Sequence, residues 1–168
     1  MKAIIPGSFD PITLGHLDLI RRVKKMGIFE EIIILVSNNP SKRYMFSIND
    51  RVDMIYTNLG FYQYLREITV DINNDLTANY AFLTDAVIIR GVRSTTDCEY
   101  ELNMALCNKR IVEDIETIII PTSQEYLHIS SSAVREILKC GKDKELIGSI
   151  LVNFVHCEII PILLKGIS

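Results

Sequence analysis

The chain has 168 residues, of which 48% are hydrophobic and 23% are charged, and its formal net charge at pH 7 is −3. This length suits one domain, since domains mostly hold about 100–200 residues, and we expect a single domain over residues 1–168. The apolar fraction excludes a disordered chain. The slight acidic excess argues against a protein that coats nucleic acid, whose surface is usually basic.

The cysteines and the apolar runs indicate a cellular compartment. The four cysteines are Cys98, Cys107, Cys140 and Cys157. They form no C-x-x-C pair and no zinc-like cluster with the histidines, so we expect free thiols in a reducing cytosol and no protein-borne metal site. Pro6 and Gly7 follow too soon for a secretory signal, and no apolar run approaches the roughly 18–20 residues of a membrane span. We therefore expect a soluble cytoplasmic protein without a membrane partner.

Short β-branched runs along the chain predict strands. Continuous apolar runs of this length are typical of strands covered on both faces of a parallel sheet. In chain order the candidates are Lys2–Ile5, Glu31–Val36, Ile68–Ile72, Ala86–Ile89 and Glu116–Ile120.

Helical periods separate these runs. The first helix has apolar residues at spacings of three from Leu17, basic residues toward its end, and Gly27 to end it. The second opens at the capping box Ser47–Asp50 and runs through Leu59, with Gly60 as its stop. Further helices are predicted over Leu76–Leu83, Asp97–Arg110 and Ser131–Lys139, the last ended by Gly141.

Strands that alternate with helices favour a doubly wound α/β fold around a five-stranded parallel sheet. Pro161 interrupts any single long helix in the tail after Leu146. In open parallel sheets, ligands bind outside the carboxyl ends of the strands. Segments 6–16, 38–43, 90–93 and 124–132 follow predicted strands and carry hydroxyls, cations or glycines. We therefore expect a phosphate-binding site at this edge.

Segment 6–16 is the most informative of these. Gly15 removes a side chain where the first helix begins, so backbone N–H groups can face an anion. His16 lies in the first helical turn, where its imidazole could donate a hydrogen bond to a phosphoryl oxygen. A lone histidine in this position is more often structural. The chain has neither G-x-x-x-x-G-K-[ST] nor G-x-G-x-x-G, which excludes a P-loop NTPase and the dehydrogenase fingerprint.

Two segments carry a family resemblance. Thr13–His16 (TLGH) resembles the T/H-x-G-H signature of the nucleotidylyltransferase superfamily, and Ile129–Arg135 (ISSSAVR) resembles its second signature. Within the superfamily the chain is most similar to the bacterial phosphopantetheine adenylyltransferases. The discriminating segments are 6–11, 40–42 with Met45 and Phe46, 90–93, and Asp97 with Glu99–Glu101. The similarity runs in order from residue 2 to about residue 140.

The resemblance implies a fold, an activity and an assembly. The fold would be Rossmann-like, and the enzyme would transfer the adenylyl group of ATP to 4′-phosphopantetheine. The resemblance further implies Mg²⁺ as cofactor, bound mainly through ATP phosphates, and a homohexamer.

It also implies roles for single residues. His16, Lys42 and Arg93 would be catalytic. The acceptor would be held by Ser8, Lys42, Thr77 and Arg90. ATP would be bound by Ser8, Phe9, His16, Gly91, Val92, Arg93, Glu101, Tyr126, Leu127, His128, Ile129, Ser130, Ser131 and Ser132. Thr77 stands where the family commonly has a larger apolar residue, and the apolar tail from Ile150 onward departs from the family's charged final helix.

Alternatives remain open at this stage. A sister enzyme could use another acceptor, such as nicotinamide mononucleotide, or transfer a cytidylyl group. A protein of another class, a non-catalytic nucleotide sensor, could share the fold. The serine triplet could be only a helix cap, and Glu101 could lie on a solvated helix face. His128 and His156 lack any partner with triad or metal spacing, and we interpret both side chains as structural.

Overall fold

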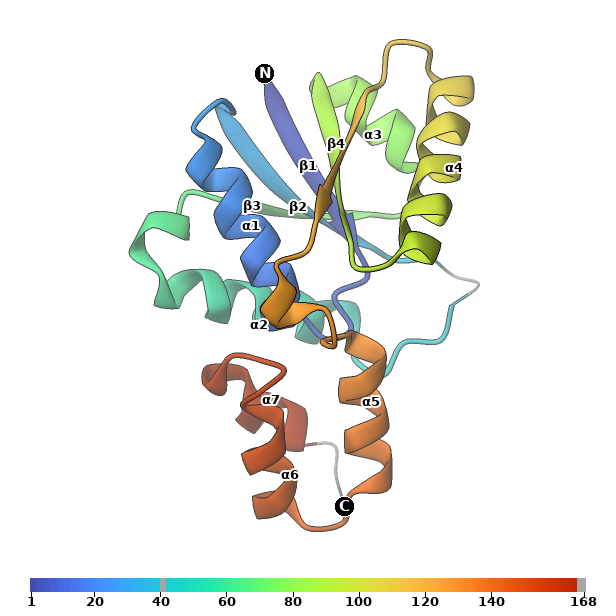
Figure 1. Ribbon diagram of the computed structural model, residues 1–168. Helices are drawn as coiled ribbons and strands as arrows, with labels where there is room; N and C mark the ends of the chain where they lie inside the picture. Colours follow the sequence, from blue (N-terminus) through green and yellow to red (C-terminus); the bar gives the residue numbers. More distant parts are fainter. Residues whose placement is uncertain (40–41, 166–168) are drawn as a thin grey trace.

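The computed structural model describes residues 1–39 and 42–165. Parallel strands form one sheet in the order β3-β2-β1-β4-β5. Their bounds are β1 (Lys2–Gly7), β2 (Glu31–Ser37), β3 (Thr69–Asn73), β4 (Ala86–Val92) and β5 (Thr117–Pro121). The chain begins at the centre of the sheet and winds outward in both directions, which confirms the predicted doubly wound fold (Figure 1).

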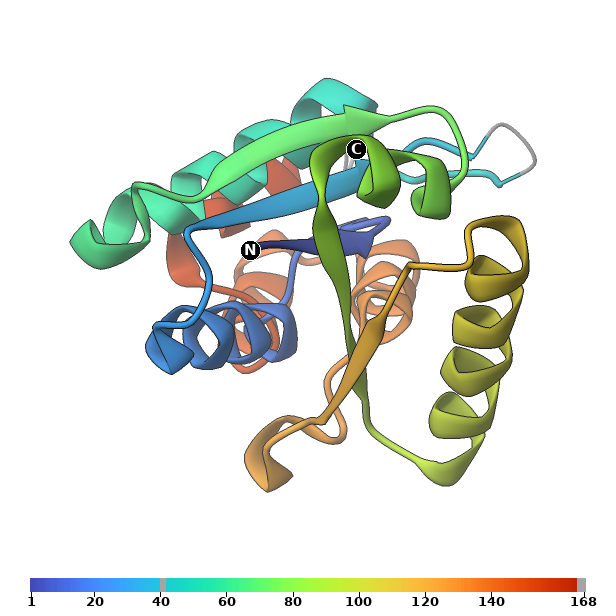
Figure 2. The ribbon, with the colours of Figure 1, turned by 90° about the horizontal axis from the view of Figure 1, so that it is seen from above.

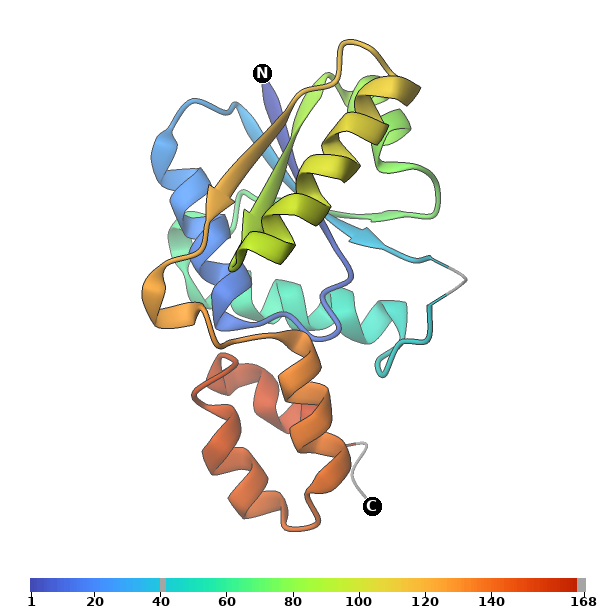
Figure 3. The ribbon, with the colours of Figure 1, turned by 45° about the vertical axis from the view of Figure 1, so that its right-hand side comes forward.

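The helices lie on both sides of this sheet. They are α1 (Leu14–Met26), α2 (Ile48–Phe61), α3 (Thr77–Thr84), α4 (Thr95–Ile111), α5 (Ser131–Cys140), α6 (Lys144–Leu151) and α7 (Ile160–Leu164). Helix α4 lies across the sheet from α1 (Figure 2). Helices α5 to α7 form a lobe beneath the carboxyl ends of the strands (Figure 3). None of the helices within residues 1–39 and 42–165 is long and apolar enough to cross a membrane.

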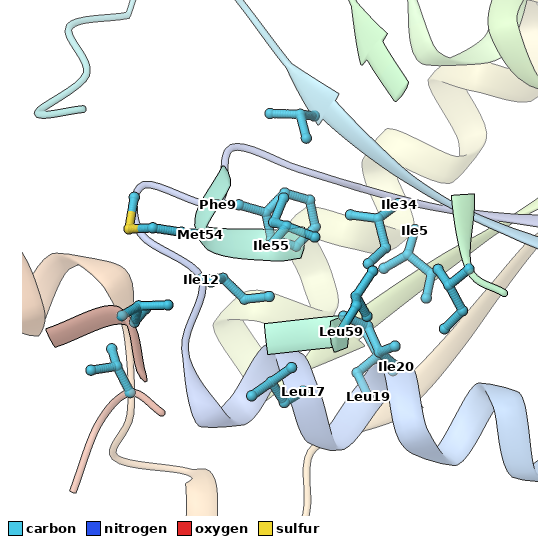
Figure 4. Packing of buried hydrophobic residues seen from close by; sticks show 14 of the residues in the cluster. Ile5, Phe9, Ile12, Leu17, Leu19, Ile20, Ile34, Met54, Ile55 and Leu59 are labelled. Carbon is cyan, nitrogen blue, oxygen red and sulfur yellow. The ribbon is translucent and has the colours of Figure 1, made fainter. Parts of the chain in front are cut away.

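The burial of β1 and β2 on both faces explains why their sequences are continuously apolar. In β1, Ala3 and Ile5 pack in the cluster that contains residues of α1 and α2, while Ile4 packs in a second cluster beside α3. Figure 4 shows part of the first cluster, where Phe9 and Ile34 meet the side chains of α2. Because both faces of β1 and β2 are covered, successive residues are buried and the period-two alternation disappears.

The edge strands differ from this expectation. Strands β3 and β5 each have a single neighbour, and Ile72 and Ile118 stay more than one-third exposed. Coverage on both faces was therefore the wrong prediction for these two strands, because an edge strand has a neighbouring strand on one side only and its side chains stay partly open to solvent. Strand β4 also runs further than predicted, so Arg90, Gly91 and Val92 lie within it.

The helix ends mostly follow the sequence. Gly27 ends α1 in the left-handed conformation with φ 66°, as predicted. Gly60 as the stop of α2 was wrong: the glycine lies inside the helix, and Tyr62 forms the C-cap through its N–H to the carbonyl of Leu59. Pro161 lies in the first turn of the short helix α7, so the tail holds no single long helix.

Candidate active site

Two adjoining cavities open at the carboxyl edge of the sheet. The first has a volume of about 340 Å³ and lies between the ends of β1 and β4 and the starts of α1 and α5. The second has a volume of about 600 Å³ and lies between the ends of β1, β2 and β3 and helix α4. Both are lined by Pro6, Gly7, Ser8, Arg90 and Glu101. The two cavities therefore form one divided cleft.

The predicted site residues separate between these two halves. The first cavity is lined by Ser8, Phe9, His16, Gly91, Arg93, Ile129, Ser130, Ser131 and Ser132. Lys42 and Thr77, both assigned to the acceptor, line the second cavity, whereas Arg90, also assigned to the acceptor, lines both. Outside both cavities lie Val92, Tyr126, Leu127 and His128. Pro40 and Ser41, which belong to the family resemblance, lie outside the described residues.

The start of α1 fixes the protonation of His16. The backbone N–H of Thr13 donates to Nδ1 of His16 over 3.1 Å. Since Nδ1 accepts this bond, the imidazole proton resides on Nε2. Burial, and the nearby charges of Arg90 and Arg93, lower the pKa of His16 to about 4. At pH 7 the residue is therefore a neutral hydrogen-bond donor on the wall of the first cavity.

This lowered pKa gives the folded protein a pH-dependent stability. Between pH 6.5 and about 4 the unfolded chain binds a proton at this residue that the folded protein does not, so acid favours unfolding. We expect the urea midpoint of the wild-type protein to fall more over this interval than that of His16→Gln, with the two curves parallel above it. Equal slopes for the two proteins would contradict the lowered pKa.

The end of β1 is tightly packed around Phe9. This residue adopts the left-handed conformation with φ 47°, and its ring is 1% exposed in the core. A Cβ at Gly7 would lie 3.0 Å from that ring, closer than ordinary van der Waals contact, so a larger residue there would require the ring to shift. Because the whole residue is only 1% exposed, Phe9 contributes little surface to the first cavity that it lines.

Two arginines of the cleft are held by carboxylates of α4. The Nε and Nη2 groups of Arg90 donate to Glu101 over 2.7 and 2.5 Å, and its Nη1 donates to the carbonyl of Pro6. Glu101 is 8% exposed. The interpretation of Glu101 as a solvated residue is therefore wrong, because it is the buried partner of Arg90. Arg93 Nε similarly lies 3.0 Å from Asp97, and its Nη1 donates to the carbonyl of Ile129 over 3.3 Å.

The serine triplet connects the two signature segments. Ser130 caps α5 by accepting the N–H of Ala133 over 3.1 Å, which confirms the helix-cap interpretation. The hydroxyl of Ser131 donates to the carbonyl of Pro11 over 2.8 Å. Ser132 accepts from Arg135, whose other Nη donates to the carbonyl of Asp10 over 2.7 Å. These bonds fasten the start of α5 to the loop after β1.

One residue that lines the cleft and one that supports it from outside were not among the predicted site residues. Arg135 lines the first cavity, and its place at the end of the second signature could have indicated it. Asp10 is 2% exposed and accepts the N–H groups of Met45 and Phe46 over 3.0 and 2.9 Å. It thereby anchors the loop that carries Lys42.

The cleft offers few protein ligands for a metal ion. Within the described parts of the chain, no three His, Cys, Asp or Glu side chains are grouped closely enough to hold a cation. The carboxylates of the first cavity, Asp97 and Glu101, are each paired with an arginine.

Comparison with known sequences identifies a family model and several proteins that this chain resembles. A family model described as cytidylyltransferase-like matches residues 4–137. A phosphopantetheine adenylyltransferase of Thermotoga neapolitana is 40% identical over 144 residues, 85% of this chain and 86% of that protein. One of Nostoc punctiforme is 47% identical over 142 residues, 84% of this chain and 75% of that protein.

Comparison with solved structures supports the fold. The nicotinic acid mononucleotide adenylyltransferase of Plasmodium falciparum complexed with NaAD matches with a TM-score of 0.67 at 18% identity, over 99% of this chain and 98% of that one. A nicotinate-nucleotide adenylyltransferase from Vibrio parahaemolyticus, described as putative, matches with a TM-score of 0.65 at 19% identity, over 97% of both chains. At such identities the likeness shows the Rossmann-like fold alone.

Proposed function

Because the chain belongs to the cytidylyltransferase-like family and, within it, to the phosphopantetheine adenylyltransferases, we infer that it transfers the adenylyl group of ATP to 4′-phosphopantetheine. The products are dephospho-coenzyme A and pyrophosphate, which places the reaction in coenzyme A biosynthesis. The observation that carries this inference is the divided cleft: His16, Arg93 and the serine triplet line one cavity, Lys42 and Thr77 line the other, and Ser8 and Arg90 line both.

The reaction needs charge neutralisation more than a base. An oxygen of the acceptor phosphate forms a bond to the α-phosphorus of ATP, and the bond from that phosphorus to the bridging oxygen of the β-phosphate breaks. The acceptor phosphate is already a nucleophile, so no covalent intermediate is required. Two polyanions must instead meet in line, and positioning and electrostatic stabilisation lower the barrier.

The residues of the cleft supply these effects. Lys42 and Arg90 neutralise the acceptor phosphate from the second cavity, with Thr77 beside the pantetheine arm. From the first cavity, the Nε2–H of His16 and the guanidinium of Arg93 stabilise charge that develops on the ATP phosphates. When bound through ATP, Mg²⁺ adds positive charge on the same phosphates.

A coupled assay tests the function and its rivals. We expect pyrophosphate release and a product of the mass of dephospho-coenzyme A with ATP, Mg²⁺ and 4′-phosphopantetheine, and none after the cation is chelated. Turnover of nicotinamide mononucleotide in place of this acceptor, or of CTP in place of ATP, would indicate a sister enzyme. Nucleotide binding without turnover of any acceptor would indicate a sensor.

We also propose that the protein works as a homohexamer in the cytoplasm. Helices α3 and α4 expose large apolar side chains: Leu83 is 81% exposed, Tyr100 60%, Phe82 59% and Leu106 57%. A monomer would leave this surface in water, which supports self-association. Light scattering should give a mass six times the 19.1 kDa of one chain. The unpaired state of all four cysteines fits a reducing compartment.

A further inference from the structure

Arg51 of α2 lines neither cavity, yet it contacts the loops from which the second cavity is built. Its side chain is 1% exposed. Its Nη1 donates to the backbone carbonyls of Ser8 over 2.7 Å and Ser37 over 3.0 Å, and its Nη2 donates to Oδ1 of Asn38 over 3.4 Å. One guanidinium thus joins the chain at the end of β1 to the chain at the end of β2.

The charge of Arg51 is not compensated by an ion pair. Within residues 1–39 and 42–165 no carboxylate forms a salt bridge with it, and the neighbouring Asp10 pairs with Arg135 instead. Burial lowers the pKa of Arg51. Arginine is almost never fully buried unless it is paired, and an unpaired buried cation costs folding free energy.

The same arginine supports the loop that carries Lys42. The guanidinium lies over the ring of Tyr44, 4.0 Å from the ring centroid. The hydroxyl of Tyr44 accepts the N–H of Asn39 over 2.9 Å, and the N–H of Lys42 donates to the carbonyl of Asn39 over 3.0 Å. Arg51 therefore influences both Ser8 and Lys42, which line the second cavity from different loops.

We propose that Arg51 is a positioning residue for the acceptor half of the cleft. Its guanidinium holds Ser8 and the loop that carries Lys42 at the separation that the acceptor phosphate requires. The ATP half is fastened mainly through Ser131 and Arg135, and Arg51 reaches it through the carbonyl of Ser8, which lines both cavities. This inference rests on the proposed function, because it takes the acceptor to lie between Ser8 and Lys42.

Steady-state kinetics of Arg51→Met test the inference. We expect KM for 4′-phosphopantetheine to rise at least about tenfold and KM for ATP to change by less than about twofold, since a small misplacement of binding groups is costly. The matched control is Arg21→Met. Arg21 also lies 4.0 Å from a tyrosine ring centroid, that of Tyr62, but lines neither cavity. Its loss should leave both KM values unchanged.

The outcomes separate this inference from the function on which it rests. Absence of turnover by the wild-type protein would overturn the function. A wild-type enzyme that is active, together with an Arg51→Met variant whose two KM values are unchanged or rise equally, would overturn the positioning role alone. If Arg51→Met does not fold, the same experiment is done with Arg51→Lys, because lysine keeps the positive charge and loses the guanidinium that bonds to both loops. For Arg51→Lys we likewise expect KM to rise for 4′-phosphopantetheine but not for ATP. If both KM values of this variant equal those of the wild-type protein, the inference is overturned.

Discussion

Replacement of His16 by alanine should lower turnover at least about 10²-fold while the protein stays folded, because one preorganised donor to a developing oxyanion is typically worth that much. His16 has the two properties that this role requires. It lines the first cavity, and its lowered pKa keeps it neutral, with the proton on Nε2, when ATP arrives. Initial rates at saturating concentrations of both substrates measure the effect.

A second histidine provides the control for this experiment. His156 is 9% exposed, and burial lowers its pKa as well, but it contacts the rings of Phe61 and Tyr62 away from the cleft. His156→Ala should therefore keep wild-type turnover per folded molecule. If His16→Ala loses activity only in proportion to its loss of folded protein, as judged by circular dichroism and the unfolding midpoint, the residue is structural.

Replacement of Arg90 by methionine should damage both stability and activity. Removal of the guanidinium leaves Glu101, only 8% exposed, without its bidentate partner. Because Arg90 itself is 28% exposed in its side chain, we expect a loss of about 2–3 kcal/mol in the free energy of unfolding, below the full cost of breaking a buried pair. We also expect kcat/KM for the acceptor to fall at least about 10²-fold.

A double variant separates these two effects. Arg90→Met combined with Glu101→Leu replaces the pair by apolar side chains, which is often neutral for stability. Urea unfolding should show most of the lost stability restored, while kcat/KM for the acceptor stays at the value of Arg90→Met. A double variant as unstable as the single one would contradict the unpaired carboxylate as the cause. Recovery of activity would contradict the phosphate-binding role of Arg90.

The sequence predicted the strands and most helices because each is defined by local signals. Gly27 and the Ser47 capping box are local features, and both lie where their neighbours in the sequence indicate. The prediction that α2 ends at Gly60 was wrong because a glycine ends a helix only when the surrounding packing allows the chain to turn there. The exposed faces of β3 and β5 depend on strand order, which no single segment encodes.

The site could be predicted only in part, for the same reason. The signatures named the residues that line the cleft, since they form short continuous segments. They did not reveal that Glu101 pairs with Arg90, because those side chains come from different elements and meet only in the folded chain. Nothing in the sequence predicted a role for Arg51, because there it is one of several charged residues of an amphipathic helix. Its burial follows from the approach of two loops in the folded chain.

The bonds from Ser131 and Arg135 to the loop after β1 have a consequence for the order in which the protein matures. They join residues 120 and 125 positions apart, and contacts of such long range form late because loop closure must precede them. Until the start of α5 has docked, the fastening of Asp10 and Pro11 is absent. Nucleotide affinity should arise only in the last stage of folding.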